Sequence, residues 1–263
     1  MKAIRIPAIA AALLASVSLP ANAQEAEALA TQLANPVAAL ISVPVQVNYD
    51  SGGGSRGDTW VTNVQPVIPT SLNSDWNVVS RTILPIINQQ GLAPAQGSRS
   101  GLGDIVQSFF FTPKAPTAGG WIWGVGPVLV LPTGSDAFSG HQWGVGPTAV
   151  ALRQDGAWSY GLLTNYVRGV SNSGLLANTT AALLQPFVTK NLGKGASVSG
   201  VLESSYDWNR GGWTVPVTVS YGQVLKLGPQ LISVGAGARY YLEKPLGGHE
   251  WGLRASVTLL FPR

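Results

Sequence analysis

The side chains best suited to covalent chemistry in this sequence are two histidines, His141 and His249, together with many serines. A histidine held beside a serine by a third polar group could activate the serine hydroxyl as a nucleophile. Both histidines fall in segments predicted to be loops, and neither lies on a predicted strand beside a fixed serine. We therefore expect no catalytic residue. Two scattered histidines without a carboxylate cluster also predict no metal site.

A glycine-rich repeat is the second candidate. The sequence Trp-Gly-Val-Gly-Pro occurs at 123–127 and again at 143–147. Glycine loops bind nucleotides in a turn between a strand and a helix, and neither copy has that setting. A two-residue alternation instead places the glycines on the inner face of strands, where they leave room for a passing solute or for a neighbouring backbone: Gly124, Gly126, Gly144 and Gly146.

Polar and charged side chains within otherwise apolar strands form the third group. A mid-bilayer arginine on a lipid-facing surface would cost roughly 2 to 4 kcal/mol, so an inward orientation is expected for all of them. Inside, they either line a solute path or pair with one another across a filled interior. The members of this group are Gln46, Asn48, Asn63, Gln65, Arg81, Glu203, Asp207, Arg239 and Arg254.

Regular strands must position these groups, and the clearest strand is the last, Trp251 to Phe261. Apolar residues occupy every odd position of this strand, while glycine, arginine, serine and threonine occupy the even positions as far as Thr258. Such alternation is typical of a strand with one face toward lipid and one toward a wet lumen. The segments 198–208 and 213–221 repeat the pattern.

Nine weaker segments bring the predicted count to twelve: 43–49, 60–68, 76–84, 104–112, 121–131, 143–152, 158–167, 179–190 and 230–241. Charged residues make up 11% of the chain, against about 25% in soluble domains, so much of the surface is expected to avoid water. No mature segment has the 18 or so continuous apolar residues of a spanning helix. We therefore predict an all-β fold, a closed antiparallel transmembrane β-barrel of 12 strands, with a soluble β-sandwich as the alternative.

The connections and the tryptophans support the barrel independently. Links alternate between short, turn-rich segments and longer ones, with 209–212 as the exception. All nine tryptophans fall near strand ends, where lipid meets the headgroups. The predicted outer belt contains Trp60, Trp143, Trp208, Trp213 and Trp251, and the inner belt Trp76, Trp121, Trp123 and Trp158, joined by 109–111.

The N-terminal region has two parts. Residues 1–23 resemble a signal peptide, with Lys2 and Arg5 before an apolar stretch and Ala21-Asn22-Ala23 as the cleavage site; a membrane anchor is the alternative. Residues 24–42 are predicted to be a periplasmic or plug segment with a short helix broken at Asn35-Pro36, or else a disordered terminus. The barrel is assigned to 43–263.

Several stretches resemble the outer-membrane protein family of the meta-pathway of phenol degradation, some of whose members carry the label neuromedin U. They are 35–44, 65–69, 101–105, 113–116 and 251–254, and they extend over most of the mature chain. The resemblance implies a transporter-type barrel for small molecules, including aromatic or hydrophobic ones. The chain departs from usual barrels at its end, where Pro262-Arg263 follows Phe261.

Together, these observations predict an exported channel or facilitator in the bacterial outer membrane that performs no covalent chemistry. The alternatives are a structural or surface-interaction barrel with a blocked lumen and, by analogy with twelve-stranded phospholipases, an outer-membrane lipid hydrolase. No cofactor is expected. The expected partners are membrane lipids and a small-molecule solute. Nucleic acid is not expected, because Lys2 and Arg5 of the signal contribute two of the +4 formal charges.

Overall fold

The structure is a computed structural model that describes residues 23–53, 57–91, 97–170, 180–209 and 211–262. One helix, α2 (Ala23–Leu33), precedes a single antiparallel sheet. The strands of this sheet are β1 (Ile41–Gly53), β2 (Gly57–Val64), β3 (Val67–Ser71), β4 (Trp76–Gln90), β5 (Arg99–Leu102), β6 (Ile105–Pro113), β7 (Trp121–Leu131), β8 (Gly144–Asp155), β9 (Trp158–Gly169), β10 (Thr180–Gly193), β11 (Ala196–Leu202), β12 (Ser204–Asp207), β13 (Gly212–Leu227), β14 (Gln230–Glu243) and β15 (Trp251–Phe261).

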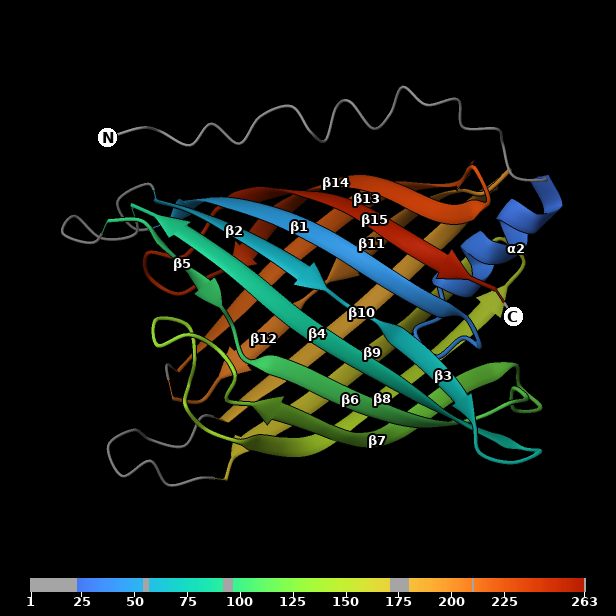
Figure 1. The fold of residues 1–263 in the computed structure, drawn as a ribbon, viewed down its shortest axis with the longest axis horizontal. Coiled ribbons are helices and arrows are strands. Elements are labelled where there is room, and N and C mark those ends of the chain that lie inside the picture. The colour runs from blue at the N-terminus through green and yellow to red at the C-terminus, as the bar shows by residue number, and fades with distance from the viewer. Residues whose placement is uncertain (1–22, 54–56, 92–96, 171–179, 210, 263) are drawn as a thin grey trace.

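The sheet closes into a barrel of twelve strands (Figure 1), as the alternation predicts. Three of these barrel strands are interrupted once, so the pairs β2/β3, β5/β6 and β11/β12 each act as one strand. The closing strand β15 pairs with β1 along its whole length, from Ile41 opposite Phe261 to Ser51 opposite Trp251. Closure pairs the backbone groups of the two edge strands, as a barrel surrounded by lipid requires.

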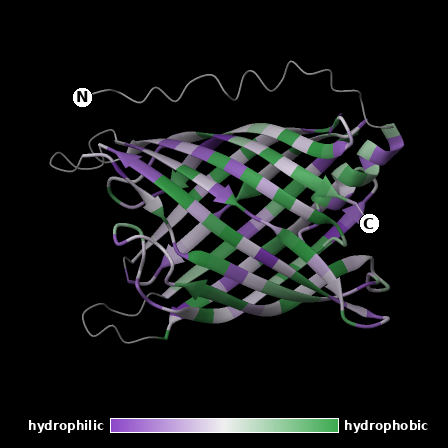
Figure 2. Cartoon of the chain, in the orientation of Figure 1, coloured by the Kyte–Doolittle hydropathy of each residue, from purple (hydrophilic) through white to green (hydrophobic). Residues whose placement is uncertain are grey.

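The two faces of β15 differ in exposure as its sequence predicts. Leu253 and Val257 are 52% and 45% exposed on the outside, whereas Thr258 is buried inside. Figure 2 shows hydrophobic and paler residues alternating along the strands that face the viewer. The outer wall is therefore apolar over most of the barrel height.

Some strands are longer than the predicted segments. β1 and β2 extend toward each other as far as Gly53 and Gly57, and β13 continues from the predicted end at Tyr221 to Leu227. The sequence pattern did not predict the extension of β13, because the inward residue Val224 is apolar and interrupts the alternation of polar and apolar residues. Val224 is apolar because α2 covers it.

The two ends of the barrel have different connections. One end carries the compact turns 72–75, 114–120, 156–157, 194–195 and 228–229, together with α2 and the C-terminus (Figure 1). The other end carries most of the longer links, although the β12–β13 turn is short, as its sequence predicts. The predicted signal peptide lies outside the described residues except for Ala23.

Aromatic side chains gather at both ends of the outer wall. Tyr49 lies between Trp60 and Trp251, with ring centroids 4.8 and 5.8 Å away, and Trp76 contacts Trp123 at 5.7 Å at the opposite end. The more exposed tryptophans, each at least 41% accessible, are Trp60, Trp121, Trp143, Trp158, Trp208, Trp213 and Trp251. Phe110 differs from its neighbours in the predicted inner belt: it points into the barrel and is 1% exposed, so its assignment to the belt was wrong.

The apolar core lies inside the barrel, near the end with the short turns. Ala26, Leu29 and Ala30 of α2 pack with Leu40 against inward residues of β13, β14 and β15, namely Val224, Leu231 and Leu260. Farther along, Val37 packs into a second cluster with Val79, Phe110, Val150, Leu152 and Leu163. The N-terminal segment therefore enters the barrel, as the plug hypothesis expects. Within the described residues, no helix has the length and hydrophobicity needed to cross a membrane.

Candidate functional site

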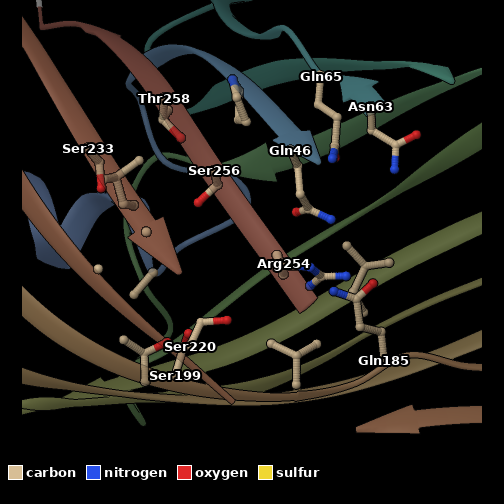
Figure 3. Close-up of a pocket in the computed structure, with 18 of the residues that line it drawn as sticks. Gln46, Asn63, Gln65, Gln185, Ser199, Ser220, Ser233, Arg254, Ser256 and Thr258 are labelled. Carbon is tan, nitrogen blue, oxygen red and sulfur yellow. The ribbon is translucent and has the colours of Figure 1, made fainter. Parts of the chain in front are cut away.

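A cavity of about 480 Å³ lies inside the barrel next to the N-terminal segment (Figure 3). Ala30, Leu33 and Ala34 of that segment form part of its wall. The remaining lining comes mainly from inward-facing residues of strands around most of the barrel, and β7 and β8 contribute none. A solute inside would therefore contact side chains of the barrel wall and of the N-terminal segment.

The cavity has two chemically different walls. Serines and threonines of β11, β13, β14 and β15 form one wall: Ser197, Ser199, Ser220, Ser233, Ser256 and Thr258. The other wall, from β4, β6, β9 and β10, is mixed: Arg81, Ser108, Asn165, Gln185 and Thr189 lie among the apolar residues Ile83, Val106, Phe110, Leu163 and Leu183. Such a cavity can solvate a polar group on one side and contact an apolar body on the other.

Each of the three strand interruptions lies opposite a proline. The amides of Gln65, Gly103 and Glu203 donate to the carbonyls of Pro44, Pro85 and Pro216, at 2.8, 2.8 and 3.0 Å. A proline has no N–H, so the reciprocal hydrogen bond of the ladder cannot form. Two of these irregular positions carry long polar side chains, Gln65 and Glu203, which both line the cavity.

Glu203 joins two arginines inside the barrel. Its Oε2 accepts from Arg254 Nη2 at 2.7 Å and from Arg239 Nη2 at 3.5 Å, while Arg239 Nη1 donates to Asp50 Oδ2 at 3.0 Å. These four residues form an ionic cluster with two positive and two negative groups. Because the partners come from β1, β14, β15 and the β11/β12 junction, the cluster ties the polar side of the barrel together.

Two amides surround Arg254 from β1. Arg254 Nε donates to Asn48 Oδ1 at 2.7 Å. The Gln46 amide, with its oxygen turned to the guanidinium, accepts from Nε and Nη2 at 3.2 Å. These contacts fix the guanidinium of this cluster member at the cavity wall.

Arg81 lies apart from the ionic cluster, on β4. Its Nη2 donates to Gln65 Oε1 at 2.8 Å, and no carboxylate among the described residues forms a salt bridge with it. Arg81 and Gln65 line both the large cavity and a smaller one of about 190 Å³ beside the N-terminal segment, where Asn35 and Pro36 also form the wall. Arg81 therefore stands where the two cavities meet.

Most of the predicted inward residues occupy this interior. Those that line the large cavity are Gln46, Asn63, Gln65, Arg81, Glu203 and Arg254. Asn48 and Arg239 do not line it, but they contact the lining residues Arg254 and Glu203, respectively. Asp207 is different, because its Oδ1 accepts from the Asn209 amide at 2.9 Å in the β12–β13 turn and it does not line the cavity. The cavity therefore gives no support to its prediction as a lining residue, since strand parity does not tell where along the barrel a residue lies.

The N-terminal segment is held in place by specific contacts. Gln154 Nε2 donates to the Thr31 carbonyl at 2.8 Å, and Asn191 Nδ2 donates to Thr31 Oγ1 at 2.8 Å. A Cβ atom at Gly195 would lie 2.8 Å from the Ala26 Cβ, so the glycine allows the helix to approach the wall. Apolar packing and hydrogen bonds together fix this segment inside the barrel.

The two glycine repeats lie side by side, with Pro127 directly opposite Pro147 on β7 and β8. A Cβ atom at Gly126 would collide with the Phe109 carbonyl, and one at Gly146 with the Tyr166 carbonyl. At Gly124 and Gly144, the nearest atoms belong to inward side chains such as Phe110 and Val167. The glycines therefore serve close packing of neighbouring strands, and none of them lines either cavity.

The histidines lie at the end with the longer links. His141 Nε2 is 3.9 Å from Asp136 Oδ1, and both side chains are exposed. Burial lowers the pKa of His249, as do Arg239 and Lys244, and its Nδ1 has no hydrogen-bond partner in the described part of the chain. No group of three or more histidine, cysteine, aspartate or glutamate side chains there could hold a metal ion.

The family model described as "Putative MetA-pathway of phenol degradation" matches residues 39–244. The chain belongs to this family. The match begins at the end of the N-terminal segment and ends after β14, so both cavities are built mainly from the matched region. No curated protein is recognisably similar to the chain in sequence.

Solved structures share the barrel of this phenol-degradation family member. The COG4313 outer membrane channel from Pseudomonas putida F1 aligns with a TM-score of 0.66 at 15% identity, covering 85% of this chain and 96% of that one. The beta domain of the Bordetella autotransporter BrkA aligns with a TM-score of 0.49 at 13% identity, covering 84% and 99%. At these identities the first similarity supports the fold alone.

Several interior residues escaped the sequence prediction. Asp50 was placed in a loop, although it has the inward parity of Asn48 two residues earlier. Ser108, Asn165 and Gln185 also face the cavity, from strands whose alternation is weaker because apolar residues fill much of their inner face. Extending the parity of each strand would have found Asp50, but the apolar inner residues depend on the position of the N-terminal segment.

Proposed function

We propose that this protein is an outer-membrane channel through which small molecules diffuse along the barrel interior. The observation that carries the proposal is the partly polar cavity inside a closed barrel whose outer wall is apolar and edged by tryptophans. Membership of the family and the shared fold with a protein described as an outer membrane channel support it. Export through a signal peptide at 1–23 belongs to the same proposal.

The interior favours passage over catalysis. Neither imidazole hydrogen-bonds a serine among the described residues, whereas acyl transfer requires an oriented base. Amides, hydroxyls and ion pairs instead form a fixed polar surface that can replace part of a solute's hydration. We expect the protein to act without a cofactor and without enzymatic activity. Membrane lipids are expected to surround it.

The size of the cavity limits what can pass. A volume of about 480 Å³ holds a molecule the size of a monosaccharide or a single aromatic ring, and the N-terminal segment narrows the remaining path. Larger polar solutes should be excluded. The blocked barrel is the second candidate, because α2 and Val37 pack so closely inside the wall.

Solute entry into vesicles tests the proposal. The full mature chain, folded into liposomes, should admit arabinose far faster than raffinose, and empty vesicles should admit neither at a comparable rate. A correctly folded protein whose vesicles take up arabinose no faster than empty ones would overturn the channel and favour the blocked barrel. Folding would be checked first by the shift in electrophoretic mobility between heated and unheated samples.

A further inference from the structure

The charges inside the barrel do not balance. The ionic cluster of Asp50, Arg239, Glu203 and Arg254 is neutral in sum, with each carboxylate bound to at least one guanidinium. Arg81 adds a further positive charge, and its partner Gln65 is uncharged. Because an arginine remains protonated in proteins, the charged residues that line the two cavities or pair with their lining carry a net positive charge.

The excess charge lies on the path through the barrel. The charged residues that line the large cavity are Arg81, Arg254 and Glu203, and Arg81 alone is charged in the lining of the smaller cavity. A solute that moved between the two cavities would come close to Arg81, because Arg81 lines both. In a narrow interior with low-dielectric walls, a single fixed charge acts over the whole width of the path.

The rest of the wall indicates what kind of anion fits. Opposite the serines, apolar side chains such as Val106, Phe110 and Leu163 line the same cavity between polar residues of the same strands, among them Ser108 and Asn165. The apolar part of this wall offers a hydrated inorganic ion no favourable contact. An organic anion with an apolar or aromatic body would contact it while its charged group faces the guanidinium and hydroxyl groups.

We propose that the channel selects small organic anions with an apolar body, and that Arg81 is the residue that determines this selectivity. This inference rests on the proposed function, because it assumes that solutes cross the barrel. It adds the charge and chemical class of the solute, which neither the shape of the cavity nor the fold decides. Arg254 supports the same preference at the other side of the cavity but is largely neutralised by Glu203.

Zero-current potentials across planar bilayers test this selectivity with permanently charged probes. We expect the wild-type channel to pass benzenesulfonate in preference to benzyltrimethylammonium by a ratio on the order of threefold or more. Arg81→Gln should bring the ratio near one, and Arg81→Lys should keep most of the preference because it keeps the charge. Arg168→Gln is the matched control, since Arg168 is exposed on the outer face of β9 opposite Val145 and should leave the ratio unchanged.

The outcomes separate this inference from the channel itself. Equal permeation of both probes or a preference for the cation would overturn anion selectivity, and an unchanged ratio in Arg81→Gln would overturn the role of Arg81; a working channel remains in each case. A folded wild-type protein that conducts neither probe nor potassium chloride would instead contradict the proposed function. If Arg81→Gln fails to fold, Arg81→Lys still tests the proposal: a ratio close to that of Arg168→Gln agrees with it, whereas a ratio near one contradicts it.

Discussion

Replacing Val257 with arginine should destabilise the barrel by roughly 2 to 4 kcal/mol, because it places a charge against lipid near the middle of β15. Val257 is 45% exposed on the outer wall and lies between the aromatic residues Trp251 and Phe261 at the two ends of the strand. A guanidinium there loses its hydration and lies between Val45 and Val234 of the neighbouring strands, which offer no charge to pair with. Urea titration of folding into lipid vesicles would measure the loss.

Ser256 provides the matched control one residue away. Its side chain faces the cavity, so Ser256→Arg would place the same charge in a polar, hydrated space and should change the folding free energy by less than about 1 kcal/mol. Equal losses for the two variants would contradict the assignment of the two faces. An inverted order would mean that β15 presents its even positions to lipid.

Deleting residues 25–34 should raise the single-channel conductance several-fold. This segment supplies Ala30, Leu33 and Ala34 to the cavity wall and fills the barrel end beside Val224 and Leu260. Its removal opens that end to water. The stability should fall as well, because each large apolar side chain that loses its packing costs about 1.5 to 3 kcal/mol.

Two further variants separate plugging from general damage. Gln154→Ala combined with Asn191→Ala removes both hydrogen bonds to Thr31 and should increase conductance fluctuations while leaving the wall intact. Glu27→Gln changes an exposed position of α2 and should leave the current as in the wild type. If the deletion variant folds and conducts no more than the wild type, the segment does not restrict the path.

The barrel was largely predictable because lipid outside and a polar lumen inside impose a two-residue period on each strand. In β15 that period is regular from Trp251 to Thr258, and the structure confirms its pairing with β1. The count of twelve strands followed from the same period combined with alternating short and long links. The interruptions opposite Pro44, Pro85 and Pro216 were not expected, since they depend on which residue of the next strand faces each proline.

The interior was less predictable for a related reason. Val224, Leu231 and Leu260 face inward but are apolar, because the N-terminal segment covers them. Sequence periodicity describes one strand and its two environments, and it cannot reveal that a helix from elsewhere fills part of the lumen. The same limit applies to Phe110, because its inward position can be inferred only from its packing in one cluster with Val37.

The partners within the ionic cluster also depend on the closed barrel. Parity placed Arg239, Arg254 and Glu203 inside, but their contacts join residues 36 and 51 positions apart in the chain. Asp50 completes the cluster from β1 across the closing seam. Only the register between β14, β15 and β1 fixes which charge meets which.

A single cysteine placed inside or outside the wall tests most directly whether solutes cross through this cavity. The natural chain has no cysteine, so a thiol reagent would label only the introduced site. Ser220 lines the cavity, and its neighbour Val219 is 56% exposed on the outer face. We expect a bulky methanethiosulfonate to block most of the current of Ser220→Cys and to leave that of Val219→Cys unchanged. Complete labelling of Ser220→Cys, verified by mass, with an undiminished current would contradict passage through the cavity.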